Sequence, residues 1–415
     1  MKRKSGTFQT FWRNEMDKWV YELIVEKIPP FSLLKGRHVT TFQLLLMLFV
    51  GIGISLYYKL PLRSLIMGGL TILVVVIWSR LTLIIAPTIR AFRPSLSEEE
   101  NGIIEWYRDL LFNPRRPELF AGLAIFIPLL TYLYLNPYLI RYYLGDNPVV
   151  IAFAIVLAWD VAYRAGIGIW VYSLCLLRSF RLFNASKRRK GLEHTLLNDL
   201  KAMERMDRRG VAYGLTALLL FPVLSPDKHL TVFVIIYSLS LITFSILSIS
   251  LIRQVPWLPP DITELLERAK FAYVGHEGED FPHITPVVQV FDGRNVYFVT
   301  SKASKKFKLL KKNNRIAVLI DERDPKDFFG NKAVLIVGRA RYYDLHNFIP
   351  NILKLTKVRN LFMEKYNQYI SRYGERKEEL PEAWRLTPIL RRIPVEVEPE
   401  WVIYWRGARR IRIGL

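Results

Sequence analysis

Residues 282–310 read PHITPVVQVFDGRNVYFVTSKASKKFKLL in a chain of 415 residues. Apolar and polar residues alternate through 283–291 and again through 295–300, which is the pattern of β-strands buried on one face. Between the two runs stands Asp292-Gly293, a typical hairpin turn, because glycine adopts the positive φ that tight turns require. The stretch therefore predicts an antiparallel hairpin that is followed by a helix.

Similar strand-like runs surround this stretch. They cover 271–275, 315–321, 333–343 and 397–405, and a short helix through Ala269 precedes them, with Asp261 as its expected cap. Many short antiparallel strands, with one helix that crosses after the third, indicate a small closed barrel.

The turn from the second strand of the hairpin into the helix has the composition of a phosphate site. It offers the hydroxyls of Thr300, Ser301 and Ser304 beside the free backbone N–H groups of a helix start, and Lys305 and Lys306 add positive charge. A second interpretation is a basic helix that only improves solubility, since further lysines crowd the same segment: Lys302, Lys308, Lys311 and Lys312.

The order of these motifs resembles the pyridoxamine-phosphate-oxidase-like, FMN-binding split-barrel family. The matching residues are Pro282, His283, Thr285, Pro286, Val287, Asp292, Gly293, Tyr297, Phe298, Thr300, Ser304, Lys306 and Leu310. Two later stretches resemble the family's next strand and its closing strand: VLIVGRARYYD at 334–344 and RRIPVEVEPEWVIYW at 391–405. The resemblance covers about 261–405, a little over a third of the chain.

The resemblance implies a Greek-key split barrel with a helical insertion at 345–384, an FMN cofactor and a homodimer formed through the barrel. It implies that the flavin ring lies against Thr285, Pro286, Val287, Val288 and Gln289, and that the phosphate binds at Thr300, Ser301, Ser304, Lys305 and Lys306. Tyr273 stands where a small Thr is common, and the turn at 277–281 is unusual, which leaves substrate and cofactor selectivity open. A deazaflavin coenzyme is the alternative, since the lysines at 308–312 suit its acidic tail.

The chain before residue 254 has a different character. Hydrophobic residues make up 51% of the sequence although 23% is charged, a mixture that arises when long apolar runs adjoin ordinary soluble sequence. Because a helix needs about 20 apolar residues to cross the hydrocarbon layer, the runs predict six membrane spans. They lie near 40–58, 65–87, 119–140, 149–177, 211–224 and 230–252, and the fifth is short and contains Pro222.

Lysine and arginine predict the orientation of these spans. They are concentrated before the first span and in the loops at 88–117 and 178–210, the last of which contains Lys187, Arg188, Arg189 and Lys190. The alternate loops hold few, so both termini are expected in the cytoplasm of a multi-pass cell-membrane protein. The net charge of +22 is accounted for by this pattern, and no nucleic-acid partner is expected.

Asp160 and Arg164 lie one helical turn apart in the fourth span. A lone charge there costs about 2.5–3.5 kcal/mol on insertion scales, so the two are expected to form a pair. The pair either fixes helix packing or marks a path for a substrate or protons. The single Cys175 permits no disulfide within the chain and no metal site is predicted, and the histidines lie outside the span centres, which disfavours membrane haem.

Four segments follow from these patterns: a cytoplasmic amphipathic segment at 1–38 with Phe8, Phe11 and Trp12 on one face, a six-helix membrane domain at 39–253, a proline-rich linker at 254–260 and the barrel at 261–415. A second amphipathic helix is expected from Ser97. The predicted function is a membrane-anchored, FMN-dependent oxidoreductase acting on a lipophilic substrate. Its electron donor and its catalytic residues are not assigned, because flavin hydride transfer needs no dedicated acid or base. The alternatives are a deazaflavin-dependent reductase and a non-catalytic flavin sensor or transporter-associated protein.

Overall fold

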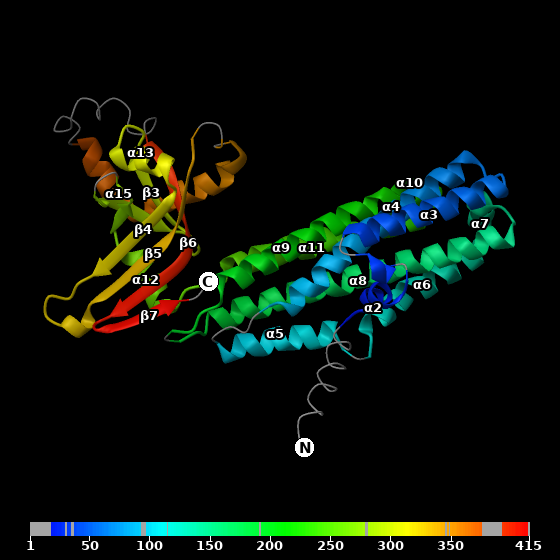
Figure 1. Cartoon of the computed structure of the whole chain (residues 1–415), viewed down its shortest axis with the longest axis horizontal. Coiled ribbons are helices and arrows are strands. Elements are labelled where there is room, and N and C mark those ends of the chain that lie inside the picture. The colour runs from blue at the N-terminus through cyan, green and yellow to red at the C-terminus, as the bar shows by residue number, and fades with distance from the viewer. Residues whose placement is uncertain are drawn as a thin grey trace, which may run out of the picture. The chain divides into compact units, whose positions relative to one another are not determined.

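The computed structural model describes residues 18–29, 31–34, 37–92, 97–113, 115–190, 192–278, 281–344, 347, 349–375 and 392–413. The chain divides into two compact units. Unit 1 comprises Met1–Arg188 and Asp199–Val255, and unit 2 comprises Arg189–Asn198 and Pro256–Leu415. Figure 1 shows that unit 1 is helical and that unit 2 contains the strands.

Unit 1 is built from long helices joined by short turns, and its elements run in the following order. They are α2 (Val20–Lys27), η1 (Phe31–Leu33), α3 (Arg37–Tyr57), α4 (Leu62–Arg90), α5 (Glu98–Leu111), α6 (Pro117–Leu135), α7 (Pro137–Leu144), α8 (Pro148–Ser186), α9 (Leu197–Ala217), η2 (Leu218–Leu220), α10 (Phe221–Leu224) and α11 (Lys228–Gln254). Within the described residues, five helices are long and apolar enough to cross a membrane: α3, α4, α6, α8 and α11.

The expected fifth span, at 211–224, is not one of these five helices. It is the apolar end of a longer element, because α9 begins at Leu197 and its first half is polar, with Lys201, Glu204 and Arg208. The apolar residues continue through η2 and α10 without completing a long apolar helix. The number of spans and the side of each terminus therefore stay predictions.

Helix α8 is the central element of unit 1. Its 39 residues extend over about 58 Å, roughly twice the hydrocarbon thickness of a bilayer. It packs very closely on α6, because a Cβ at Gly166 would lie 2.4 Å from the carbonyl carbon of Ala121. Its C-terminal half buries Arg178, which pairs with Asp207 of α9 at 2.8 Å.

The N-terminal helix α2 belongs to this unit as well. The indole of Trp19 donates to the carbonyl of Leu111 at 3.0 Å, and Glu22 pairs with Arg90 at 2.6 Å. Residues 1–17, which contain the expected apolar positions Phe8, Phe11 and Trp12, lie outside the described residues. The second expected amphipathic helix is α5, which does begin after Ser97.

Unit 2 is a closed barrel whose strands lie close to the predicted ranges. They are β1 (Phe271–His276), β2 (His283–Phe291), β3 (Val296–Ser301), β4 (Arg315–Glu322), β5 (Lys332–Tyr342), β6 (Arg392–Arg406) and β7 (Arg409–Ile413). All neighbours are antiparallel, and a β3–β6 pairing closes six of the strands into a barrel. This architecture confirms the expected split-barrel fold behind a helical region.

The helices of unit 2 cover the barrel. They are α12 (Pro260–Arg268), α13 (Lys305–Lys312), η3 (Phe328–Gly330), η4 (Ile349–Asn351) and α15 (Ile352–Glu375). From the expected insertion, α15 packs Val358 and Tyr366 against Val290 and Tyr297 of the barrel, whereas residues 376–391 lie outside the described residues.

Two local predictions were wrong. Asp261 does not cap α12, because the helix already begins at Pro260 and Asp261 lies in its first turn, where it pairs with Arg406 at 3.4 Å. The final strand β7 was not expected either, since the sequence RRIRI is short and highly charged and does not read as a strand.

Candidate functional site

The turn between β3 and α13 is held by the hydroxyls expected there. Ser304 is the N-cap of α13, where its Oγ accepts a hydrogen bond from the backbone N–H of Phe307 at 3.2 Å. The hydroxyls of Ser304 and Thr300 lie 2.9 Å apart, and Oγ of Ser301 accepts from the N–H of Ala303 at 3.3 Å. The three predicted hydroxyl residues are thus brought together at the start of a helix, where free N–H groups and the helix dipole favour an anion.

The two predicted lysines differ in their surroundings. Lys305 is exposed, whereas Lys306 is partly buried. Burial lowers the pKa of Lys306 below its ordinary value, because a buried ammonium group loses hydration. Lys306 is therefore the lysine whose charge is directed at the protein rather than at solvent, and an anion beside it would recover the lost hydration energy.

His276, at the end of β1, joins this site although the sequence did not single it out. It is 5% exposed, and neither of its ring nitrogens has a hydrogen-bond partner among the described residues. Burial lowers its pKa to about 4, assisted by the positive charge of His283 and Lys306 nearby. His283 faces it across the β1–β2 pair. The only sequence signal would have been the hairpin register, which places these two histidines opposite each other.

The residues expected to contact a flavin ring lie on both faces of β2. His283, Thr285, Val287 and Gln289 point to one side, and the alternate residues, including the exposed Pro286, point to the other. Oγ1 of Thr285 is buried without a partner among the described residues. Thr285 can thus still bond a ligand through its hydroxyl, and so can Gln289 through its side-chain oxygen Oε1, which also has no partner among the described residues.

Gln289 also has a structural task. Its side chain is fully buried, and its Nε2 donates to the carbonyls of Leu266 at 2.8 Å and Ala269 at 2.6 Å. These bonds hold the end of α12 against β2. The side-chain amide hydrogens are therefore already used.

Together, these groups make up the candidate phosphate site, at one end of the barrel. It combines the half-buried Lys306, the unpartnered His276 and Thr285, and the start of α13. Unpartnered buried donors are costly unless a ligand satisfies them. The donor set fits a phosphate group, which offers several strong acceptor oxygens and negative charge.

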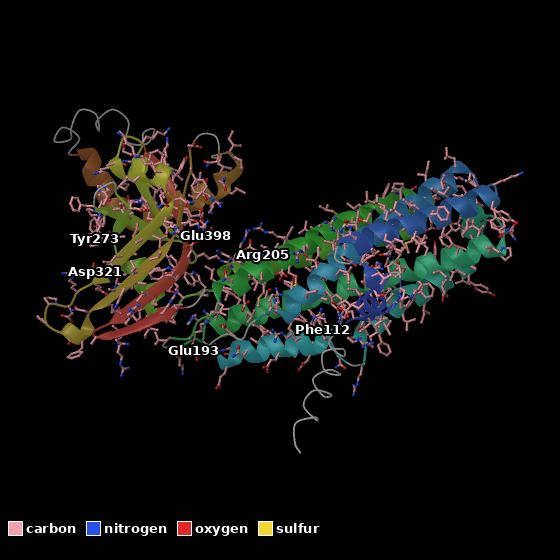
Figure 2. The ribbon with its side chains drawn as sticks, viewed as in Figure 1. Phe112, Glu193, Arg205, Tyr273, Asp321 and Glu398 are labelled. Atoms are coloured by element: carbon pink, nitrogen blue, oxygen red, sulfur yellow. The ribbon has the colours of Figure 1, made fainter. Side chains whose placement is uncertain are left out.

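The outer face of the same strands is apolar. Phe271 and Tyr273 on β1 are 52% and 44% exposed, and Ile284 on β2 is 64% exposed. Tyr273 is labelled in Figure 2. The register places these residues side by side, since Gly275 pairs with Ile284 and Tyr273 with Pro286. Such a continuous apolar face on a barrel is typical of a protein interface.

The predicted pair in the fourth span is an ion pair. Nη2 of Arg164 lies 2.9 Å from Oδ1 of Asp160, and the guanidinium group also lies 4.2 Å above the ring of Tyr21. Nε and Nη1 of Arg164 have no hydrogen-bond partner among the described residues. The pair lies within α8, and the contact of Arg164 with Tyr21 joins α8 to α2, which agrees with a role in helix packing.

Comparison with known families identifies both units. Residues 15–248, more than half of the chain, match the model of a family of unknown function, DUF7530. The chain belongs to this family. In this DUF7530 protein, residues 259–346 match pyridoxamine 5'-phosphate oxidase, and unit 2 therefore carries a domain of that kind. This match confirms the resemblance predicted from the sequence.

Three solved structures similar to the DUF7530 protein cover 35–38% of its chain. An FAD-binding protein from Mesorhizobium loti is 16% identical over 35% of this chain and 91% of its own, with a TM-score of 0.27. A protein of the pyridoxinephosphate oxidase family from Clostridium acetobutylicum is 18% identical over 37% and 92%, with a TM-score of 0.25. A heme binding protein from Mycobacterium smegmatis is 12% identical over 38% and 58%, with a TM-score of 0.28. A search of curated proteins finds no significant match.

Proposed function

We propose that the DUF7530 protein is a membrane-anchored flavoprotein whose barrel binds FMN with the phosphate in the site of Lys306, His276, Thr285 and Ser304. The observation that carries this proposal is the unpartnered His276 beside the half-buried Lys306, on a barrel that matches pyridoxamine 5'-phosphate oxidase. A bound flavin would supply hydride and electron transfer. Lys306 and the start of α13 would hold the phosphate, Thr285 would bond an adjacent oxygen, and His276 would donate one ring N–H.

The activity follows as part of the same proposal. A flavoprotein joined to a set of membrane helices is suited to reducing or oxidising a lipophilic compound. Its electron donor would come from the cytoplasm, where the positive-inside pattern predicts both termini. The barrel would form a homodimer through the apolar face of Phe271, Tyr273 and Ile284. These exposed side chains would be buried from water by the second subunit.

The test is an absorption spectrum of the detergent-purified full chain, followed by the mass of the released cofactor. We expect a flavin spectrum and the mass of FMN. Lys306→Ala should lose most of the bound flavin, whereas Lys305→Ala, which removes an exposed neighbour of the same charge, should retain it. Equal retention by the two variants would exclude the phosphate site.

The mass of the released cofactor, together with a test of its reduction by added electron donors, separates the other candidate functions. Release of a deazaflavin would identify the protein as a deazaflavin-dependent reductase. The lysines at 308–312 would then hold the acidic tail of that coenzyme. Bound flavin that is not reduced by any pyridine nucleotide or reduced quinone would favour a sensor. A colourless protein that binds neither added cofactor would overturn the redox proposal.

A further inference from the structure

A cavity of about 320 Å³ lies inside unit 1. Helices α3, α4, α6, α7, α8, α10 and α11 all contribute to its wall. These include the five helices that are long and apolar enough to cross a membrane. The side chains that line it are almost all aliphatic or aromatic, and its volume lies within the ordinary range of small-molecule sites.

The aromatic residues of the wall turn their polar atoms away from the cavity. The indole N–H of Trp78 donates to the carbonyl of Tyr213 at 3.1 Å, and the Tyr237 hydroxyl donates to the carbonyl of Ala165 at 3.0 Å. Trp78 also stacks on Tyr213, with ring centroids 4.9 Å apart. These bonds leave the carbon faces of the rings as the lining.

Two further polar groups of the wall are occupied as well. Thr71 donates to the carbonyl of Met67 at 2.9 Å. The carboxylate of Asp227 accepts from the backbone N–H groups of His229 and Leu230 and from the hydroxyls of Tyr132 and Tyr138. Since water needs several polar partners to remain in a cavity, this cavity favours an apolar occupant.

The cavity reaches the surface of the helical unit. Two of its lining residues, Ile52 of α3 and Phe233 of α11, are 44% and 50% exposed. Both lie on helices that qualify as membrane spans, so their exposed faces are directed at lipid when the helices cross a bilayer. A hydrocarbon chain could enter sideways without passing through water.

We propose that this cavity binds one hydrocarbon chain of a membrane lipid. The cavity and the chain match in chemistry, because an apolar wall gains dispersion contacts with a hydrocarbon chain that is already dissolved in the bilayer. The proposal rests on the cavity alone and is independent of the flavin, so that a colourless barrel would leave it standing.

Glycines in the wall supply a sharp test. A Cβ added at Gly68 would meet no atom within 4 Å, so the larger side chain of Gly68→Leu would extend into the cavity. Gly53 of α3 also has open space at its Cβ, but it does not line the cavity. Gly53→Leu is therefore a matched control that adds the same side chain to the lipid-facing surface.

The experiment uses the full chain in nanodiscs whose phospholipids have brominated or ordinary acyl chains, because bromine quenches tryptophan fluorescence on contact. The contribution of Trp78 to the quenched fluorescence is the difference in quenching between the wild type and Trp78→Phe. Trp78 is 1% exposed and lines the cavity, so lipid on the outer surface cannot reach it.

We expect brominated chains to quench Trp78 in the wild type and in Gly53→Leu, and to lose most of this effect in Gly68→Leu. An unquenched Trp78 in the wild type, or equal quenching in the two leucine variants, would overturn the proposal. If Trp78→Phe does not fold, native mass spectrometry of lipid retained after purification decides instead: Gly68→Leu must lose a lipid that Gly53→Leu and the wild type keep.

Discussion

His276 and His283 lie opposite each other across the first two strands of the barrel, in register and close to Lys306. The arrangement places three basic groups at one end of a barrel and leaves the more buried histidine without a hydrogen-bond partner among the described residues. A protein unit that had only to fold would gain little from burying an unpartnered imidazole beside other basic groups. Its cost can be measured in the protein without cofactor.

The stability of the cofactor-free barrel should fall in mild acid. The pKa of His276 is about 4 in the folded chain and near 6.5 in the unfolded chain. Between these values only the unfolded state takes up the proton, so unfolding becomes easier as the pH falls from about 6.5 to about 4, by up to about 3 kcal/mol. Thermal unfolding at several pH values should show this, and His276→Gln should flatten the curve. Parallel curves for the two proteins would contradict the prediction.

A second prediction concerns the buried carboxylate of Glu396, which is 3% exposed. Burial alone would raise its pKa, but hydrogen bonds from Lys354, Tyr343 and Tyr297 hold the pKa below its ordinary value. Lys354→Met would leave this charge with fewer donors and should lower the free energy of unfolding by roughly 2 kcal/mol. Lys357→Met, an exposed change on the same helix, should be nearly neutral. Chemical denaturation followed by tryptophan fluorescence would compare them.

Oligomeric state gives a third prediction. The exposed Tyr273 lies in the centre of the apolar face on β1 and β2, so Tyr273→Asp should place a charge in the dimer interface and shift the protein to monomers. Light scattering after size exclusion, corrected for detergent, would report the mass. An exposed site directly after β4, Arg323→Asp, is the control. A wild type that is monomeric at all concentrations would refute the interface.

The helical unit supplies the fourth prediction. Arg178 and Asp207 are fully buried, and Asp207 also accepts from Ser248 at 2.7 Å. Asp207→Asn would leave the buried guanidinium without its counter-charge, at a cost of about 3–5 kcal/mol. The exposed Arg208→Gln on the same helix should cost under about 1 kcal/mol. Thermal aggregation in detergent should separate the variants clearly, and equal midpoints would show that the pair is not important for stability.

The sequence predicted the barrel well because its signals are local. Alternation and the Asp292-Gly293 turn determined β2 and β3 to within a residue. Contacts between distant segments could not be predicted from the sequence in the same way. His276 is brought to the site by the register of β1 and β2. The partners of Glu396 come from β3, the end of β5 and α15. The expected fifth span stays a prediction, because its hydropathy was assessed without the polar half of the same helix, α9, and the whole helix is not among the five candidate spans.

The membership of Arg189–Asn198 in unit 2 has a practical consequence. This decapeptide comes from the connection between α8 and α9, yet the Arg189 guanidinium donates to the carbonyl of Pro256 and to the Thr195 hydroxyl. A gene truncated to begin at Pro256 would therefore not encode the whole barrel unit. Soluble expression of the flavin domain would require the decapeptide to be joined to the new N-terminus by a short linker, or supplied as a separate peptide.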